Sequence, residues 1–420
     1  MKLLTVDTLE EAREKLSRCI KFLPLENEAI SLNDALLAFN SQPRVLSKDL
    51  YVSSDIPGFR RATVDGYAVV ASDTAAAGEA IPVFLKLIGA VSMGTSADFS
   101  IHSGECAYVP TGGMLPGGAD AVVMVEHTEC SGANISVYEA AAPGSGMASQ
   151  GEDLRKGEML LRRGALIRPQ EAGALAASGI MNLLVFAPLK LSIISTGDEL
   201  IPPESSPGPG QIRDINSYAL KALAIKRGYR VVSSQVLPDD EAALEAALRE
   251  AMAESDVIAV SGGSSQGDKD MTSSIIQRAA KPGVFTHGLA LKPGKPTILG
   301  WDEESRTVLA GLPGHPVAAM MVFELLLGWL GDSLFGRPHP LPAPARISCN
   351  VPGSPGRTVC QSVILHPPAE NAVNAGSYVA EPVFGKSGMI STLTRANGYI
   401  LIDMNKEGLN QGELVMVYPM

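Results

Sequence analysis

The stretch Lys190–Asp214, KLSIISTGDELIPPESSPGPGQIRD, decides the fold of this chain. It opens with an apolar run rich in β-branched residues, which favours a buried strand. The run ends at Thr196-Gly197-Asp198-Glu199, a small, flexible and acidic turn. Ligands of parallel α/β sheets collect at the carboxyl ends of the strands. We therefore expect a parallel sheet whose first turn presents carboxylates to a ligand.

Two related turns follow later in the chain. The apolar run 256–260 leads into residues 261–270, SGGSSQGDKD, a glycine-rich turn with two aspartates. A further glycine turn, KPGKP at 292–296, carries Lys292 and Lys295. Carboxylates, backbone N–H groups and lysines around one cleft suit an anionic ligand that is held partly through a divalent metal.

Length and charge limit the class of protein. A chain of 420 residues is too long for one hydrophobic core, so about three domains are expected. The net charge is -11 and no dense block of Lys and Arg is present. A nucleic-acid binder needs a basic surface, so this class is excluded. A small anionic substrate is not excluded, because a few local cations can hold it.

The cysteines and the apolar stretches indicate a soluble, cytoplasmic protein. The five cysteines are scattered without CxxC spacing, which is typical of reduced cytosolic thiols. The N-terminus has no uninterrupted apolar core, so no signal peptide is expected. The longest apolar stretch, Pro316–Leu330, contains Glu324 and is too short to cross a bilayer. We expect it to form a buried helix.

Changes of pattern along the chain predict a multi-domain α/β protein with two small β domains. Helical spacing in residues 6–19, where Thr8 can cap the helix, 32–39 and 168–178 contrasts with short β runs between 50 and 150. Residues 189–334 alternate strand and helix, as parallel sheets do, with strands expected at 191–195, 230–235, 256–260 and 307–310 and a helix at 241–254. The expected domains are 1–49 with 151–187 (helical and extended), 50–150 (β), 188–336 (α/β) and 337–420 (β), the last after a proline-rich connector.

Each chemical signal also has a plain structural interpretation. Asp239 and Asp240 precede a predicted helix and can serve only as its caps. Asp65 can be a turn acid, Thr111 a turn hydroxyl, and the glycine turn an ordinary loop. The functional interpretation becomes stronger because three separate groups of acids each follow a strand of the same predicted sheet. Clustered carboxylates repel one another unless a cation or a raised pKa relieves the repulsion.

Motifs that the chain lacks narrow the chemistry further. No GK[ST] follows the glycine turn, so it is not a Walker loop. The six histidines show neither HxH nor HExxH spacing, which disfavours a built-in zinc site. Magnesium held by oxygen ligands suits the acids better. The absence of GxSxG argues against a serine hydrolase.

Eight segments in order resemble one family, the molybdopterin molybdenumtransferases, which insert molybdenum during molybdenum cofactor synthesis. A single segment is weakly specific, whereas eight in this order are highly specific and run along nearly the whole chain. They are DIPGFRRATVDGYAV (55–69), PTGGMLPGGADAVVMVE (110–126), GED (151–153), STGDEL (195–200), GQIRDINSYAL (210–220), SGGSSQGDKD (261–270), LKPGKP (291–296) and GLPGHPVAA (311–319).

The resemblance implies a fold and a reaction. The implied fold has a helical and extended segment built from two chain regions, an inserted β domain, a three-layer α/β pterin-binding domain and a C-terminal β barrel. The implied assembly is an elongated homodimer, with the active site between the α/β domain of one subunit and the β domain of the other. The implied reaction turns adenylyl-molybdopterin and molybdate into molybdenum cofactor and AMP, assisted by Mg²⁺. A pterin-adenylating partner protein would supply the substrate.

Matching positions carry the functional residues of the family onto this chain. The expected catalytic residues are Asp65, Thr111, Asp153, Glu199, Asp239 and Asp270, of which Glu199, Asp239 and Asp270 are the expected magnesium ligands. The expected substrate-binding residues are Gly262, Gly263, Gly267, Lys292, Lys295, Pro313 and Ser387. This assignment agrees with the chemistry, because acids can hold magnesium and lysines can neutralise phosphate oxygens.

The chain departs from the family pattern at several positions, and most departures remove a cation or change a polar group. The usual methionine before Asp65 is Val64, and the usual serine is Ala62. The usual asparagine of GLPGNP is His315. Other departures are Ser264 and Gln266 in place of valines, Gly288 in place of a cation, no basic residue in 147–150, and no arginine around 360–362.

These departures keep alternatives open. A paralogue that handles tungstate is one alternative, and a non-catalytic pterin-binding scaffold is another. Without the resemblance, the same acids fit a magnesium-dependent nucleotide phosphotransferase, although the missing Walker loop speaks against it.

Overall fold

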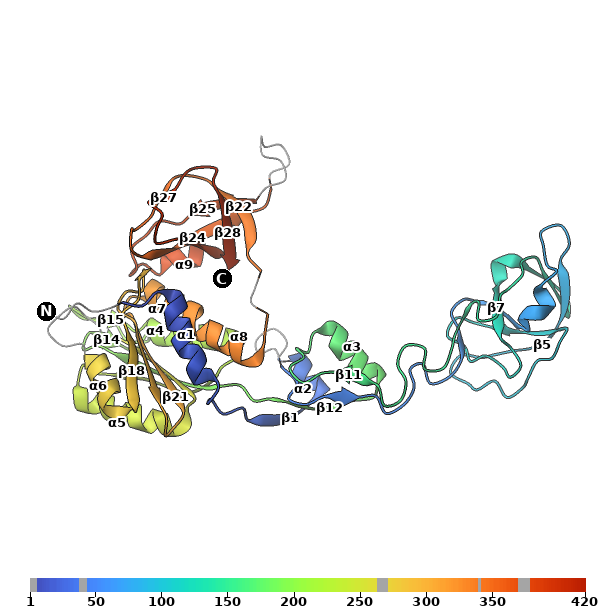
Figure 1. Cartoon of the computed structure of the whole chain (residues 1–420), viewed down its shortest axis with the longest axis horizontal. Helices are drawn as coiled ribbons and strands as arrows, with labels where there is room; N and C mark the ends of the chain where they lie inside the picture. Colours follow the sequence, from blue (N-terminus) through green and yellow to red (C-terminus); the bar gives the residue numbers. More distant parts are fainter. Residues whose placement is uncertain (1–5, 38–43, 263–270, 339–340, 369–377) are drawn as a thin grey trace. The chain divides into compact units, whose positions relative to one another are not determined.

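The computed structural model describes residues 6–37, 44–262, 271–338, 341–368 and 378–420 (Figure 1). The chain forms two compact units. The first unit comprises residues 1–30, 34–45 and 184–420, and the second comprises 31–33 and 46–183. The four-part division expected from the sequence is finer than this one and stays a prediction.

The first unit contains a six-stranded sheet that mixes parallel and antiparallel pairing. The first four strands are parallel to one another, and the last two are antiparallel to their neighbours. In spatial order the strands are β16 (Arg230–Leu237), β13 (Lys190–Thr196), β17 (Val257–Ser261), β21 (Thr307–Leu312), β20 (Ile298–Asp302) and β18 (Pro282–His287). Sequence patterns predicted the four parallel strands and missed β18 and β20.

The register of the parallel strands brings their carboxyl ends to one edge. Ser195 in β13 pairs with Ser261 in β17, and Ser261 pairs with Leu312 in β21. On the other side of β13, Thr196 pairs with Leu237, the last residue of β16. The turns that follow all four strands therefore leave the sheet together, which confirms the convergence predicted from the sequence.

Helices cover both faces of this sheet and complete a three-layer α/β arrangement (Figure 1). One face carries α5 (Glu241–Glu254) and α6 (Met271–Ala279). The other carries α4 (Asn216–Lys226) and a continuous helical run made of α7 (Pro316–Val322), the π-helical segment η3 (Phe323–Gly328) and α8 (Trp329–Phe335). The predicted fold class is confirmed.

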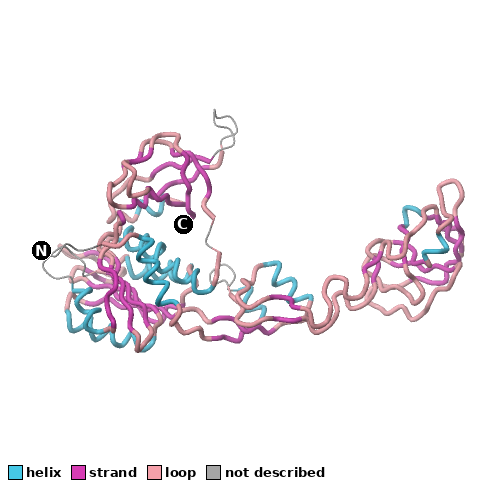
Figure 2. Tube along the Cα trace, in the orientation of Figure 1, coloured by secondary structure: helices cyan, strands magenta, loops and turns pink. Residues whose placement is uncertain are grey.

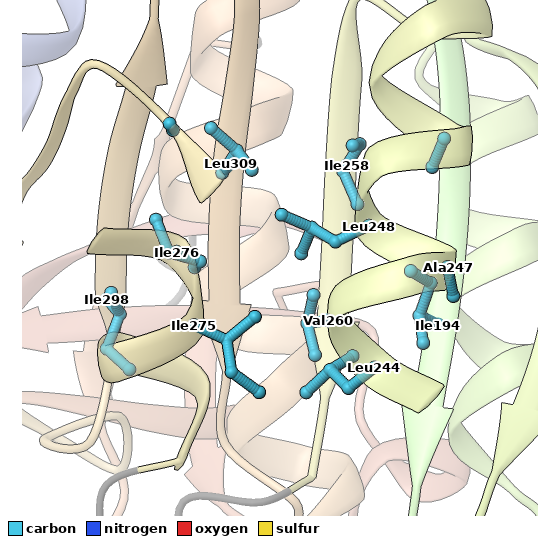
Figure 3. Packing of buried hydrophobic residues seen from close by; sticks show 12 residues of the cluster. Ile194, Leu244, Ala247, Leu248, Ile258, Val260, Ile275, Ile276, Ile298 and Leu309 are labelled. Atoms are coloured by element: carbon cyan, nitrogen blue, oxygen red, sulfur yellow. The ribbon is translucent and has the colours of Figure 1, made fainter. Parts of the chain in front are cut away.

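The core beneath α5 and α6 explains why α5 was predictable. Leu244 and Leu248 lie on one stripe of α5 and are fully buried. They pack against strand residues that include Ile194 and Val260, with Ile275 of α6 beside them (Figure 3). A helix with apolar residues at this spacing is stable mainly because its stripe is covered.

The apolar run from Pro316 is longer than predicted and continues to Phe335. By length and composition it passes the test for a membrane-spanning helix, but most of it is buried inside the protein. Burial on all sides is the ordinary reason for such an apolar helix in a globular core. The predicted buried helix is therefore present, with one more turn.

A second six-stranded sheet of the first unit is built mainly from C-terminal residues. Its strands in spatial order are β19 (Leu291–Lys292), β24 (Thr358–His366), β25 (Tyr378–Pro382), β22 (Ala343–Ile347), β28 (Leu414–Pro419) and β26 (Gly398–Ile402). β24 also pairs with β26. The strands enclose their own apolar core, which includes Ile347, Val363, Ile400 and Val417. The remaining elements here are α9 (Ser391–Arg395), β23 (Val351–Pro352) and β27 (Gly408–Leu409).

The N-terminal helix α1 (Leu9–Ile20) belongs to the first unit and lies beside α8 (Figure 1). Thr8 and Glu11 form a reciprocal capping box at its start. Such a box satisfies two backbone N–H groups that the first helical turn leaves without partners. The predicted cap at Thr8 is confirmed.

The second unit is dominated by strands and loops (Figure 2). Its six-stranded sheet has the order β7 (Ala121–Met124), β4 (Gly66–Val69), β6 (Glu105–Val109), β5 (Val83–Ala90), β9 (Asn134–Val137) and β8 (Thr128–Ser131). Shorter elements are α2 (Leu32–Leu37), α3 (Pro169–Ala177), η1 (Ala71–Thr74), η2 (Val125–His127), β2 (Leu50–Tyr51), β3 (Arg61–Ala62), β10 (Met147–Ala148) and β11 (Met159–Leu161).

Four short strands complete the chain. β1 (Asn27–Ser31) pairs with β12 (Asn182–Phe186), and the division between the units runs through both strands. β14 (Leu200–Ile201) pairs with β15 (Ile212–Arg213) in the first unit. This last pair closes the proline-rich loop of the stretch Lys190–Asp214.

We expect Leu248→Ala to lower the free energy of unfolding of the first unit by about 2–5 kcal/mol, because it leaves a cavity in a packed core. Both tryptophans, Trp301 and Trp329, lie in this unit, so their fluorescence during urea denaturation reports on it. The exposed neighbour Glu250→Ala is the control and should change the value by less than about 0.5 kcal/mol. Equal effects of the two substitutions would contradict the packing described here.

Candidate functional site

The turns after β13 and β17 touch through a glycine. Gly262 has a φ of 111°, and a Cβ on it would lie 2.2 Å from the carbonyl oxygen of Thr196. Only glycine tolerates both the backbone angle and the close approach. Gly314, in the turn after β21, also borders Gly262, because a Cβ built on Gly314 would lie 3.8 Å from the Gly262 Cα. The three turns thus form one surface at the edge of the sheet.

A carboxylate joins the turns after β13 and β16, but it is not the predicted one. Asp198 Oδ1 accepts a hydrogen bond of 3.1 Å from the backbone N–H of Asp239. The carboxylate of Glu199 instead folds back over Gly197, where a Cβ would lie 2.8 Å from Glu199 Oε2. Glu199 and Asp239 are both exposed at this edge. The turns that carry these two acids are joined through Asp198, whose role the sequence analysis missed, and the shared function of Glu199 and Asp239 stays a prediction.

The two aspartates after β16 have different roles. Asp240 Oδ1 accepts a hydrogen bond of 2.7 Å from Ala243 N–H and caps α5. The plain interpretation of Asp240 as a helix cap is therefore confirmed. The side chain of Asp239 is not the cap of this helix. It remains available for other contacts.

Asn216, which the sequence analysis did not single out, ties two of the turns together. Its Nδ2 donates hydrogen bonds of 2.7 Å to Ser261 Oγ and of 2.7 Å to the carbonyl oxygen of Gly314. Ser261 ends β17, and Gly314 precedes α7. One amide side chain thus fixes the spacing of two turns. Its position in the segment GQIRDINSYAL was the available signal.

The histidine that departs from the family pattern contacts a predicted substrate-binding serine. His315 Nδ1 lies 3.0 Å from Ser387 Oγ. The backbone supports the same contact, because Val317 N–H donates a hydrogen bond of 3.1 Å to the carbonyl oxygen of Ser387. His315 occupies the position just before α7. It therefore links the turn after β21 with the loop before α9.

The predicted lysines lie on a turn that reaches the C-terminal sheet. Lys292 ends β19, which pairs in parallel with β24, and it is exposed, as is Lys295. The turn between them is tightly packed, since a Cβ on Gly294 would lie 2.7 Å from Val322 Cγ2. Pro313, in contrast, is buried behind the turn after β21. The two ammonium groups are therefore free to meet an anion, and Pro313 can only shape the surface.

Three predicted residues, Gly263, Gly267 and Asp270, lie outside the described residues. Their assignment, including that of Asp270 as a metal ligand, stays a prediction.

The second unit holds a separate pair of predicted site residues, a carboxylate and a hydroxyl. Asp65 Oδ1 accepts hydrogen bonds from Thr111 N–H at 2.7 Å and from Thr111 Oγ1 at 3.0 Å. The backbone bond and then the hydroxyl bond hold the pKa of the Asp65 carboxyl below its usual range. Both residues are exposed. Asp65 is therefore an ionised, oriented carboxylate at neutral pH.

Glycines position this pair. A Cβ on Gly66 would lie 2.1 Å from the carbonyl oxygen of Val123, so β4 can approach β7 only with glycine there. A backbone hydrogen bond of 2.8 Å, donated by Gly112 N–H to Ala62 O, links the loop that carries Thr111 to the segment that carries Asp65. The two motifs DGYA and PTGG thus form one structural group.

Asp153 lies on a turn of its own in the second unit. It is exposed, and its backbone N–H donates a hydrogen bond of 3.0 Å to the carbonyl oxygen of Ile56. Asp55 holds the other side of this turn by accepting a hydrogen bond of 2.8 Å from Lys156 N–H. The segment GED is therefore fixed against the start of the motif that leads to Asp65.

The donor chemistry at the sheet edge fits a hard divalent cation. Glu199 and Asp239 offer carboxylate oxygens, the ligands that Mg²⁺ prefers. Within the described ranges, no three His, Cys, Asp or Glu side chains gather closely enough to hold a metal ion. The third predicted ligand, Asp270, lies outside these ranges. The assignment of Glu199 and Asp239 as magnesium ligands therefore stays a prediction.

Comparison with known protein families matches most of the chain. Residues 7–179 match the MoeA N-terminal region (domains I and II). Residues 192–331 match a probable molybdopterin binding domain, and residues 344–420 match the MoeA C-terminal region (domain IV).

Individual proteins are similar over nearly their whole length. The molybdopterin molybdenumtransferase of Bacillus subtilis is 30% identical, over 93% of this chain and 89% of that protein. The enzyme of the same name from Haemophilus influenzae is 29% identical, over 98% of both chains. A crystal structure of a molybdopterin biosynthesis MoeA protein from Pyrococcus horikoshii superimposes with a TM-score of 0.80, at 35% identity and over 99% of both chains.

We expect Thr111→Val to raise the pKa of the Asp65 carboxyl toward its ordinary value, because the hydroxyl that stabilises the charged form is lost. The backbone bond from residue 111 remains, so the rise should be partial. Because the pKa is lowered in the folded protein, the stability that this carboxylate contributes is present above the ordinary pKa and is lost as the pH falls through the lowered one. Carboxyl carbon shifts followed by NMR during an acid titration measure the change. Thr95→Val, which removes a hydroxyl bonded to Ser92 O, is the control and should leave Asp65 unchanged.

Proposed function

The chain belongs to the MoeA family of molybdopterin molybdenumtransferases, transferases that insert molybdenum into molybdopterin, and we propose that it acts on adenylyl-molybdopterin and molybdate and releases AMP. The observation that carries the proposal is the register of β13, β16, β17 and β21, which delivers acids and glycine turns to one edge. Membership of the family establishes the class of reaction. We infer that the edge of the sheet at the carboxyl ends of these strands supplies the groups that the reaction needs.

The edge suits a phosphorylated pterin. Phosphate oxygens need cations and N–H donors, and Lys292 and Lys295 are exposed cations on a firmly packed turn. Gly262 is partly exposed and carries no side chain of its own, so its backbone can approach a ligand closely. Ser387 offers a hydroxyl held by His315. These groups bind and orient the anhydride rather than react with it.

The carboxylates would position the oxyanion and the attacked bond. In the proposed reaction an oxygen of water or of molybdate attacks a phosphorus atom of the phosphoanhydride, the bond between that phosphorus and the bridging oxygen breaks, and negative charge moves onto the leaving phosphate. Lys292 stabilises that charge electrostatically. Asp65 stays ionised because Thr111 donates two hydrogen bonds to it, so it can accept a proton or orient a hydroxyl. Asp153 would take part in the reaction beside Asp65.

Magnesium is part of this proposal. Glu199, Asp239 and Asp270 would hold it. When bound, Mg²⁺ supplies positive charge to the oxygens of the phosphoanhydride. Asp198 would support this arrangement from behind, since its bond to Asp239 N–H fixes the turn that carries one ligand.

We further propose that the protein works as a homodimer in the cytoplasm. The family resemblance supports this, because it assigns Asp65 and Glu199 to one reaction although they fall in different units of the chain. In a dimer, Asp65 of one protomer would complete the active site that contains Glu199 of the other protomer. A pterin-adenylating protein would supply the substrate. Tungstate in place of molybdate is the alternative substrate.

We expect Glu199→Ala and Asp65→Ala each to lower molybdenum insertion by roughly 100-fold or more, with the fold unchanged, because each removes a charged group from the reaction. AMP release from adenylyl-molybdopterin with molybdate, and separately with tungstate, measures the activity, and circular dichroism checks the fold. Glu204→Ala, an exposed acid in the same loop as Glu199, is the control and should keep full activity. Full activity in the first two variants would remove both residues from the mechanism.

Mixing the two inactive variants tests the homodimer. If one protomer supplies Asp65 and the other Glu199, mixed dimers regain one intact site, so activity should return to about a quarter of the native value for random exchange. No recovery after proven subunit exchange would contradict a site shared between protomers.

We expect His315→Ala to weaken substrate binding by roughly 3–10-fold, because Ser387 loses the contact that holds its hydroxyl. His315→Asn should restore most of the affinity, since an asparagine side chain can also reach the hydroxyl with a polar atom. The readout is KM against kcat for adenylyl-molybdopterin, and a rise in KM alone is expected. Ser387→Ala should match His315→Ala, and combining the two should add little.

A further inference from the structure

A cavity of about 200 Å³ lies in the first unit, between α1, the helical run 323–335 and the strands β26 and β28. None of its lining residues belongs to those predicted to take part in molybdenum insertion. Its walls hold Arg13, Trp329, Tyr399 and Tyr418, together with an ion-pair network at Arg227. Trp329 and Tyr418 are partly exposed, so the cavity opens to solvent.

The aromatic walls are already arranged for a flat ligand. The rings of Tyr399 and Tyr418 stack with centroids 5.3 Å apart and an interplanar angle of 16°. Elsewhere in the lining, the guanidinium of Arg13 lies 5.5 Å from the centroid of the Trp329 ring. Aromatic faces favour planar partners in stacked or edge-on contact. A cavity of roughly 150 Å³ holds benzene, so the space here admits one aromatic ring with a substituent.

Arg13 is held rigidly and its charge lacks a close counter-ion. Its Nε and Nη2 donate hydrogen bonds of 3.0 and 2.8 Å to the carbonyl oxygen of Leu325. In the part of the chain that the structure describes, no carboxylate forms an ion pair with Arg13, although Glu10 acts on it through space. Burial lowers the pKa of this guanidinium and is the largest influence on it. Tyr399 and then Glu10 raise the pKa and partly offset the lowering. A guanidinium stays protonated in proteins, so the wall carries a positive charge.

The other charges of the cavity are mutually satisfied. Arg227 pairs with Glu324 through two contacts, one of them Nε to Oε2 at 2.7 Å. Asp332 lies 3.6 Å from Arg227 Nη1 and 3.2 Å from Arg337 Nε. The charged lining residues Arg227, Glu324 and Asp332 are thus paired with one another, with Arg337 behind them, whereas the guanidinium of Arg13 has no ion-pair partner among the described residues. A ligand with one negative charge would supply that partner.

Two further features point to a ligand. Tyr399 lines the cavity and is only 7% exposed, and among the described residues nothing hydrogen-bonds its hydroxyl. The hydroxyl oxygen is not one of the fully buried atoms that lack a partner, so it is open to a hydrogen bond from a molecule in the cavity. The wall that supplies Glu324 and the Leu325 carbonyl is π-helical, from Phe323 to Gly328. Such segments are rare and occur often at functional sites.

We propose that this cavity is a second ligand site, which takes a small planar aromatic compound with one oxyanion group, a carboxylate or a phosphate. The ring lies against Tyr399, Tyr418 and Trp329. The oxyanion meets the free N–H donors of Arg13 and accepts a hydrogen bond from the Tyr399 hydroxyl. This site goes beyond the proposed reaction and does not depend on it.

Benzoate and phenyl phosphate are the probes, because each carries one ring and one oxyanion group, and together they separate the two kinds of anion. Benzyl alcohol lacks the charge, and cyclohexanecarboxylate lacks the aromatic ring. Titration of the full chain is followed by calorimetry and by tryptophan fluorescence. Comparison with Trp329→Phe assigns the quenching to Trp329, because Trp301 is the only other tryptophan in the sequence. At least one of the two anions should bind, and both control compounds should bind about tenfold more weakly or not at all.

Variants locate the binding. Arg13→Gln should weaken binding of the anion by about tenfold or more, whereas Arg18→Gln, an exposed arginine on the same helix, should change it less than about twofold. Tyr399→Phe removes only the hydroxyl and should weaken binding by a smaller factor, so the test stands even if Arg13→Gln folds poorly. Absence of Trp329 quenching up to about 10 mM of either anion, or equal binding by the Arg13 and Arg18 variants, would overturn the proposal.

Discussion

The parallel hydrogen-bond register of β13 with β16 and β17, and of β17 with β21, is the constraint on which the functional edge depends. A shift by one residue in any of these pairings would exchange the faces of a strand and bury its outward side chains wrongly. Because both faces are covered by helices, that shift is strongly disfavoured. The packing of helices on both faces of the sheet, away from the site, therefore brings the turns together at one edge.

The glycines and amides at the edge refine what the register delivers. Gly262 lets the turns after β13 and β17 touch, and Asn216 holds the turns after β17 and β21 at a fixed spacing. The edge is thus preorganised by backbone contacts, while Glu199, Asp239 and the lysines stay exposed. Charged groups held on a rigid frame, without being consumed by internal pairing, are what binding of a polyanion requires. In the second unit Asp65 and Thr111 follow the same principle.

The sequence alone predicted those parts of the fold whose pattern is local. Helix α5 was predicted with its true limits because its stripe repeats at helical spacing, and β13 and β17 were found because they are apolar and bounded by glycine turns. β18 and β20 were missed because they alternate less clearly and pair antiparallel at the sheet margin. At the candidate site, the acids and lysines were singled out by residue type and spacing, and their roles stay predictions. The contacts of Asp198, Asn216 and His315 join residues distant in sequence, so no local pattern could show them.

The short strand β19 gives the C-terminal sheet a role beyond packing. Its two residues, Leu291 and Lys292, pair with Thr358 and Val359 of β24, and the backbone N–H of Thr358 also donates a hydrogen bond of 2.8 Å to Ala290 O. The loop that carries Lys292 is therefore anchored at one end to the C-terminal sheet and not to the α/β sheet. A displacement of the C-terminal sheet would consequently move the backbone of Lys292 and, with it, the ammonium group.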